Sequence, residues 1–196
     1  MPRPPRIEVE GAYYHVVTRG NDRQQILDDG LRRLFVMRAA EVARRYGWRV
    51  YAYALMTNHY HLVFRIGAAG LLRGMCELNG GFARASNAHF GRIDHCFGRR
   101  FWSTLLETDA HLLESVRYAL WNPARAHVGT HPRDSGWTSF RPSAGLDHPS
   151  ELIAHRELLE HFGRDAVRAR GAFSRFVSEG RVRCQAPWEE VWATVR

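Results

Sequence analysis

The feature that most constrains the fold is a pair of apolar runs separated by only two polar residues. The first run is "WRVYAYALM", from Trp48 to Met56, and the second begins after Thr57 and Asn58 and continues to about Ile66. Both runs are rich in β-branched and aromatic residues, which favour strands. So short a polar break predicts that the two strands form an antiparallel hairpin.

The second strand of this hairpin carries two histidines one residue apart. Successive side chains of a strand point to opposite faces, so His59 and His61 share a face, followed on that side by Val63. The other face of the strand is apolar and is predicted to be core; it consists of Tyr60, Leu62 and Phe64. One face therefore offers two imidazoles and the other offers a packing surface.

The remaining periodic segments complete a β-α-β-β-α-β order. That order is typical of a ferredoxin-like α+β fold, in which an antiparallel sheet carries helices on one face. The predicted strands outside the hairpin are Tyr13 to Thr18 and Phe101 to Glu107; the predicted helices are Leu27 to Tyr46, Leu71 to Phe90, and "AHLLESVRYALWN" with Asp109 as its N-cap.

The C-terminal part of the chain is predicted to be an appendage. Pro123 should break or kink the third helix, and residues 128–149, rich in Gly, Pro, Ser and His, are predicted to form a loop. Short amphipathic helices follow from Glu151. We therefore predict one domain over residues 1–145 and a C-terminal helical extension over 146–196.

Composition indicates a cytoplasmic protein with a polyanionic partner. The formal net charge is +8 and the pI is about 10.1, with arginine dominating the positive side. Arginine makes two-pronged contacts to phosphate, which favours nucleic acid, although an Arg-rich surface without a partner would have the same charge. The three cysteines form no CxxC pair, which indicates a reducing compartment, and no apolar run is long enough for a membrane span.

A tyrosine in the third helix lies off the apolar stripe. At 100° per residue, Tyr118 falls nearly opposite the apolar side, and Asn122 follows one turn later on the same face. The apolar side consists of Leu112, Leu113, Val116, Ala119 and Leu120. Such a tyrosine can be a surface residue or a nucleophile, and the two histidines can be a hydrogen-bonded pair or ligands of a divalent metal.

Four stretches together resemble a known family. They are "YHVVTRGNDRQ", "GWRVYAYALMTNHYHLVF", "LNGGFARASNAHFGRIDHCFGRRF" and "YALWNPARAHVG". In order and spacing, roughly from Gly11 to Phe140, the chain resembles the REP-associated tyrosine transposases of bacteria, within the single-tyrosine HUH (IS200-like) superfamily. It departs from that family's "PNH" pattern with Thr57 before Asn58 and His59.

The resemblance implies a ferredoxin-like nuclease that acts on single-stranded DNA hairpins such as REP elements. His59 and His61 take the positions of metal ligands for Mg²⁺ or Mn²⁺, Asn122 that of a third, amide-type ligand, and Tyr118 that of the nucleophile. The implied enzyme cleaves and rejoins DNA through a 5′-phosphotyrosine. Relatives occur as monomers or homodimers, and the implied location is the bacterial cytoplasm, at the nucleoid.

Polar and basic residues on predicted loops are the candidate DNA contacts. Loop arginines can hold a phosphate backbone, and nearby aromatics such as Phe97 and Trp102 can stack on unpaired bases, unless they are core. The candidates are Arg19, Asn21, Arg23, Arg92, Arg99 and Arg100. For Arg19 and Asn21, the strongest candidates, the alternative interpretation is a solvated turn.

Two other functions remain open on the sequence alone. One is an inactive relative that binds hairpin nucleic acid without cutting it, and needs the basic loops but neither Tyr118 nor a metal. The other is a metal-dependent hydrolase that uses water, assisted by His95 and His111, and forms no covalent adduct. The combined set of histidines, tyrosine and Asn122 favours the nuclease.

Overall fold

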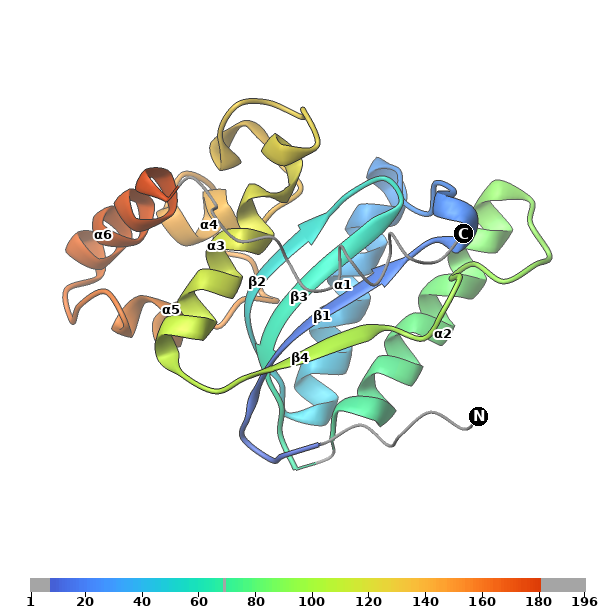
Figure 1. The fold of residues 1–196 in the computed structure, drawn as a ribbon, viewed down its shortest axis with the longest axis horizontal. Helices are drawn as coiled ribbons and strands as arrows, with labels where there is room; N and C mark the ends of the chain where they lie inside the picture. The colour runs from blue at the N-terminus through green and yellow to red at the C-terminus, as the bar shows by residue number, and fades with distance from the viewer. Residues whose placement is uncertain (1–7, 69, 181–196) are drawn as a thin grey trace.

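A four-stranded antiparallel sheet forms the centre of the molecule (Figure 1). The computed structural model describes residues 8–68 and 70–180. The strand order is β2-β3-β1-β4, with the hairpin of β2 and β3 at one side and β1 pairing with both β3 and β4. The strands are β1 (Tyr13–Arg19), β2 (Arg49–Leu55), β3 (His59–Arg65) and β4 (Trp102–Leu106). The predicted α+β, ferredoxin-like fold is confirmed.

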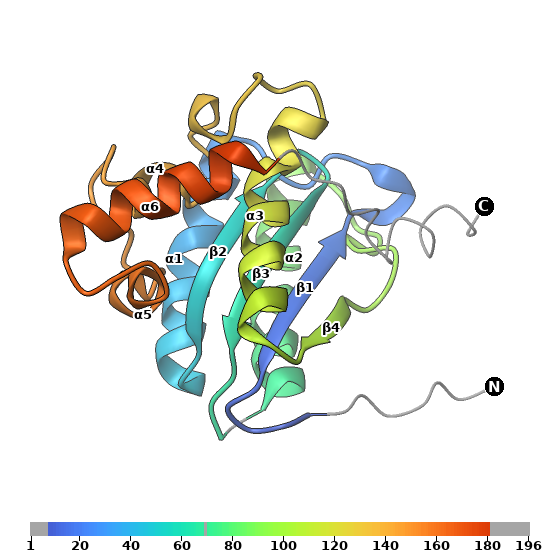
Figure 2. The ribbon, with the colours of Figure 1, turned by 60° about the vertical axis from the view of Figure 1, so that its left-hand side comes forward.

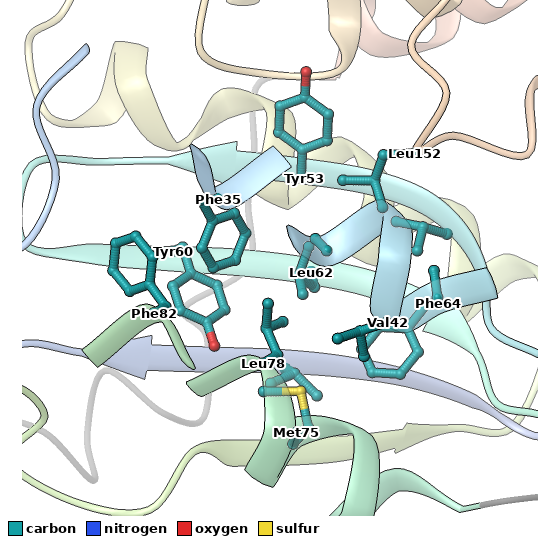
Figure 3. Packing of buried hydrophobic residues seen from close by; sticks show 14 of the residues in the cluster. Phe35, Val42, Tyr53, Tyr60, Leu62, Phe64, Met75, Leu78, Phe82 and Leu152 are labelled. Carbon is teal, nitrogen blue, oxygen red and sulfur yellow. The ribbon is translucent and has the colours of Figure 1, made fainter. Parts of the chain in front are cut away.

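Two long helices, α1 (Asp29–Tyr46) and α2 (Leu71–Phe90), cover one face of the sheet. Figure 3 shows the rings of Phe35, Tyr60 and Phe82 packed together in this layer; the Phe35 ring centroid lies 4.4 Å from that of Tyr60 and 5.3 Å from that of Phe82. Tyr60, Leu62 and Phe64 are fully buried here, as the alternation of β3 predicts. This layer is the main apolar core.

Glycine allows α2 to approach the sheet closely. The indole of Trp48 lies over Gly74, and a Cβ at Gly74 would come within 2.1 Å of that ring. Gly74 therefore serves the packing, and the helix continues without interruption through Gly80 and Gly81, although glycine lowers helix propensity.

The opposite face of the sheet is covered by α3 (Asp109–Arg125), which lies in front of the sheet in Figure 2, while α1 and α2 lie behind it. A second apolar cluster joins this helix to the sheet; among its members are Tyr51, Val63, Leu112, Val116 and Leu120. The two helices of the β-α-β-β-α-β unit lie on one face, as predicted, and the third helix uses the face that carries His61.

Two details of α3 differ from the sequence prediction. The N-cap is Thr108 and not Asp109, because the Thr108 side chain accepts a hydrogen bond from the His111 N–H. Pro123 lies inside the helix, which continues to Arg125. A proline in the last turn removes only one N–H, and the carbonyl oxygens of Asn122 and Pro123 accept from Ala126 N–H and Val128 N–H at 3.0 and 2.8 Å.

The segment after α3 contains more helix than predicted and packs on the same face. Residues 128–149 include short helices η2 (Pro132–Asp134) and α4 (Phe140–Ala144), followed by α5 (His155–Glu160) and α6 (Ala166–Glu179). Phe140 and Phe173 belong to the second apolar cluster together with α3. A division at residue 145 stays a prediction, and residues 181–196 of the proposed extension lie outside the described residues. Among those described, every helix is too short or too polar to span a bilayer.

Candidate active site

The two histidines of β3 lie beside β1 on the face covered by α3. In the β1–β3 register, Arg19 lies opposite His59 and Val17 lies opposite His61. His61 is only 1% exposed, and the centroids of the two imidazole rings are 5.2 Å apart. Two adjacent strands thus place the imidazoles and the Arg19 side chain at one end of the sheet.

Helix α3 brings a tyrosine and an amide to these histidines. The Tyr118 ring centroid lies 5.9 Å from that of His61, and Asn122 Oδ1 lies 3.4 Å from His59 Nε2. Tyr118 is 5% exposed and lies outside the apolar cluster, as its helical position predicts. It is covered by the sheet and not by solvent, because α3 buries a polar face as well as an apolar one.

The donor atoms of this cluster suit a small cation. With the His59 proton on Nδ1, His59 Nε2 and Asn122 Oδ1 present lone pairs to each other, an arrangement that a cation between them stabilises. The buried Asn122 Nδ2 has no hydrogen-bond partner among the described residues. Across that part of the chain no group of three or more His, Cys, Asp or Glu could hold a metal, so any site here would use two imidazoles and an amide.

Burial keeps the site histidines neutral. Desolvation, reinforced by the nearby Arg19 charge, lowers the pKa of His59 to about 4. The pKa of His61 is held well below its usual value by burial and by the neighbouring His59 and His15 rings. Neutral imidazole is the form that binds metals.

Basic loops meet next to His59. Gly20 N–H donates to the Asn58 carbonyl oxygen at 2.8 Å, and Asn21 N–H donates to the Cys96 carbonyl oxygen at 3.0 Å. A Cβ at Gly20 would lie 2.5 Å from the Gln24 carbonyl oxygen, so only glycine fits at this crossing. These contacts place the loop after β1 between the β2–β3 turn and the loop before β4.

The predicted DNA-contact residues divide into two sets. Arg19 is the last residue of β1 and not a loop residue as predicted, whereas Asn21 and Arg23 lie in the turn that follows it. Arg99 and Arg100 are exposed on the segment that pairs with this turn through the Gly20–Phe97 bridge. Arg92 lies apart from the histidines; its guanidinium donates to the Gln25 carbonyl oxygen at 2.6 Å and lies over the Phe90 ring. Five of the six residues therefore form a basic rim (Arg19, Asn21, Arg23, Arg99 and Arg100) along one edge of the site.

The aromatic and histidine candidates from the alternative interpretations are placed as follows. Phe97 packs on the main core with its ring stacked on Phe82, next to the buried Phe101. Trp102 is half-buried in β4, and its ring lies edge-on to that of His15 with the centroids 6.3 Å apart. His95 is exposed on the loop before β4, and His111 is exposed in the first turn of α3. His111 acts on the site electrostatically, because its charge contributes, after burial, to the lowered pKa of His15.

Three residues join the site that the sequence analysis did not select. His15 Nε2 lies 3.0 Å from His61 Nδ1, Asn58 Oδ1 lies 2.7 Å from His59 Nδ1, and the Arg125 guanidinium lies 4.7 Å from the Tyr118 ring centroid. His15 is fully buried, which lowers its pKa to about 3. The alternation of side chains along β1 could have indicated His15, because it places His15 on the same face of the strand as Arg19.

One family model and one solved structure indicate a transposase fold. A family model described as "Transposase IS200 like" matches residues 8–108, slightly more than half of the chain. A solved REP-associated tyrosine transposase bound to a REP hairpin is similar with a TM-score of 0.63, at 18% identity, over 75% of this chain and 88% of that chain. A putative transposase from Deinococcus radiodurans R1 has a TM-score of 0.42 at 15% identity, over 65% of this chain and 91% of that one. No curated protein matches the chain.

Proposed function

The chain belongs to the IS200-like transposase family, and from that premise we propose that it cleaves and rejoins single-stranded hairpin DNA through a 5′-phosphotyrosine on Tyr118. The observation that carries the proposal is a largely buried cluster in which Tyr118 of α3 lies beside His61 of β3 and Asn122 of α3 lies beside His59 of β3. Neither the apolar core nor the strand pairing needs this polar group, which favours a chemical role over a structural one.

The reaction exchanges one phosphate ester for another. The Tyr118 oxygen attacks the scissile phosphorus and loses its proton, the bond from phosphorus to the 3′ oxygen breaks, and that oxygen leaves as a 3′-OH. The 5′ phosphate stays on the tyrosine, so a 3′-OH of another strand can reverse the step and rejoin DNA. Because the ester bond is conserved, no external energy source is needed.

His59, His61 and Asn122 are the residues that would hold the Mg²⁺ or Mn²⁺ ion. When bound, such an ion supplies Lewis-acid polarisation of the scissile phosphate. The protein's own part is to bury Tyr118 beside His61 and to restrict its ring by the Arg125 guanidinium. A set of only three protein ligands leaves room for phosphate oxygens.

The basic rim supports single-stranded DNA as the substrate. Arg19 lies opposite His59 in the sheet, so a phosphate at the histidines would also meet its guanidinium. Arg99 and Arg100 extend the positive charge away from the site, where it would attract the phosphates of a bound DNA strand. The similar solved transposase is bound to a REP hairpin, which favours hairpins of that kind.

A covalent-trapping assay tests the proposal. The protein is mixed with labelled single-stranded hairpins, with Mn²⁺ or with EDTA, and the products are separated on denaturing gels. We expect an adduct that needs Mn²⁺ and disappears in Tyr118→Phe, while the matched variant Tyr13→Phe, at the other end of the sheet, retains it. Shifted hairpin DNA without adduct would support a binding protein, and cleavage that survives Tyr118→Phe would support hydrolysis by water.

A further inference from the structure

We propose that Asn58 and His15 are positioning residues that fix the tautomers of His59 and His61, so that each ring presents a lone pair on Nε2. The inference rests on the proposed function, because it concerns how the same site is prepared for a divalent cation. Its evidence is a pair of hydrogen bonds, one to each ring, from two different parts of the chain.

The tautomer of His59 follows from the orientation of Asn58. The Arg23 carbonyl oxygen can only accept, so the Asn58 atom 3.1 Å from it is the Nδ2 donor. That orientation directs Asn58 Oδ1, another pure acceptor, to His59 Nδ1 at 2.7 Å. His59 Nδ1 therefore carries the proton, and the neutral ring has its lone pair on Nε2, the atom that faces Asn122.

His15 fills the corresponding position for His61. Its Nε2 lies 3.0 Å from His61 Nδ1, and one of the two atoms must donate. If His15 donated, the proton of neutral His61 would lie on Nε2, which then could not bind a cation. If His61 donates, its lone pair lies on Nε2 and His15 is the acceptor. The cation site of the proposed function requires the second arrangement, which gives both rings the same tautomer.

The two acceptors lie on separate elements that are held in place independently of the metal. His15 is fully buried in β1, two pairs along the β1–β3 register from the pair that contains His61 and therefore on the same face of the sheet. Asn58 lies in the β2–β3 turn, and its main-chain carbonyl accepts from Gly20 N–H. Ring orientation is thus set before binding, which limits the entropy lost when the site closes on a cation.

The tautomers can be read directly in the metal-free protein. Long-range ¹H–¹⁵N correlation spectra of full-length ¹⁵N-labelled protein distinguish Nδ1–H from Nε2–H in each ring. We expect Nδ1–H for both His59 and His61 in the wild type, with loss of that preference at His61 in His15→Leu and at His59 in Asn58→Leu. An Nε2–H tautomer at either ring of the wild type would overturn the proposal.

Binding of Mn²⁺ alone, measured by calorimetry or electron paramagnetic resonance, gives the second readout. His15→Leu and Asn58→Leu are expected to weaken Mn²⁺ binding by about 10- to 100-fold. His15→Gln and Asn58→Asp keep an acceptor oxygen and should restore most of the affinity. The matched control is Thr104→Val, because Thr104 lies opposite His15 in the β1–β4 register and its buried Oγ1 has no hydrogen-bond partner among the described residues.

The outcomes separate this inference from the proposed function. Leucine variants that bind Mn²⁺ like the wild type, or a His15→Gln variant as weak as His15→Leu, would overturn the positioning role. A wild type that binds no Mn²⁺ but shows both Nδ1–H tautomers would contradict the metal site and leave the positioning of the rings supported. If His15→Leu does not fold, the wild-type spectra and the Asn58 variants still decide the question.

Discussion

The two faces of the sheet are packed by different means. On the α1–α2 face, the buried side chains are almost all aromatic or aliphatic, and the Phe35, Tyr60 and Phe82 rings interlock. On the α3 face, an apolar cluster around Val116 lies beside the buried polar group of His15, His61 and Tyr118. The α1–α2 face of the sheet therefore supplies an apolar core, whereas the α3 face combines an apolar cluster with buried polar side chains.

The difference indicates where each kind of substitution should act. Burying imidazoles costs free energy unless they are hydrogen-bonded, whereas burying apolar rings is favourable. A fold whose α1–α2 face supplies most of the stability can carry the polar group on the other face. Substitutions on the two faces should therefore change different properties of the protein.

The largest effect on stability is expected in the apolar layer. Phe35→Ala removes a fully buried ring between Tyr60 and Phe82 and should lower the free energy of unfolding by about 3–5 kcal/mol. Urea denaturation gives the value. Met37→Ala, on the same helix at 62% exposure, is the control and should change little. A loss after Phe35→Ala as small as that of the control would contradict the assignment of the main core.

Acid should loosen the α3 face before the α1–α2 face. Among the described residues, the histidines whose pKa is lowered, in each case chiefly by burial, lie on or beyond the α3 face; they are His15, His59, His61, His131 and His155. Their unfolded forms take up a proton near pH 6.5 but their folded forms do not. Above pH 6.5 these residues are neutral in both states and do not lower the free energy of unfolding. As the pH falls toward the lowered pKa of the folded state, only the unfolded state takes up protons, so the free energy of unfolding decreases, by about 3 kcal/mol for His59 at pH 4.

Hydrogen exchange of the metal-free protein at pH 7 and pH 5, corrected for the intrinsic rate, checks the acid prediction. Amides of α3 and α6 should lose protection at pH 5, while those of α1 keep it. His155→Gln retains an acceptor for Ser150 N–H, which now donates to His155 Nε2 at 3.0 Å, and should reduce the acid effect near α5 only. Equal loss on both faces would show that the sheet opens as one unit.

A smaller effect, on activity alone, is expected at Arg125. Its guanidinium lies over the Tyr118 ring, and Arg125→Met should slow adduct formation about tenfold by removing a cation–π contact and a charge beside the phosphate. Arg117 on the same helix lies over the Phe176 ring at the same 4.7 Å distance. Arg117→Met is therefore the matched control and should leave the adduct rate of the folded protein unchanged. Equal slowing in both variants would assign the effect to α3 packing.

The sequence was sufficient for the fold because its signals there are local. Strand parity placed His59 and His61 opposite Tyr60 and Leu62, and the structure has that alternation. Parity and helical periodicity need no knowledge of which strands pair. Helix bounds followed from apolar spacing, although the cap of α3 was assigned one residue late, because Thr108 and Asp109 can both serve as N-caps.

The parts of the site that were missed depend on pairing between distant segments. The contact of His15 with His61 requires the β1–β3 register, and a shift of one residue would turn His15 to the other face. The contact of Asn58 with Arg23 joins two loops. Helical periodicity located Tyr118 off the apolar stripe but could not show that the sheet would bury it.

The smallest effects compare the N-caps of the two faces. Asp28 caps α1 through Leu31 N–H and Thr108 caps α3 through His111 N–H, so Asp28→Ala and Thr108→Ala should each cost about 1 kcal/mol of stability. Fraying the start of α3 should also lower adduct formation per folded molecule, because α3 carries Tyr118, whereas fraying α1 should not. Urea denaturation and the trapping assay measure the two quantities, with Thr108→Ser as the variant that keeps the cap. Equal loss of adduct in Asp28→Ala and Thr108→Ala would mean that the two faces are coupled through the sheet, and the separation of stability from chemistry would fail.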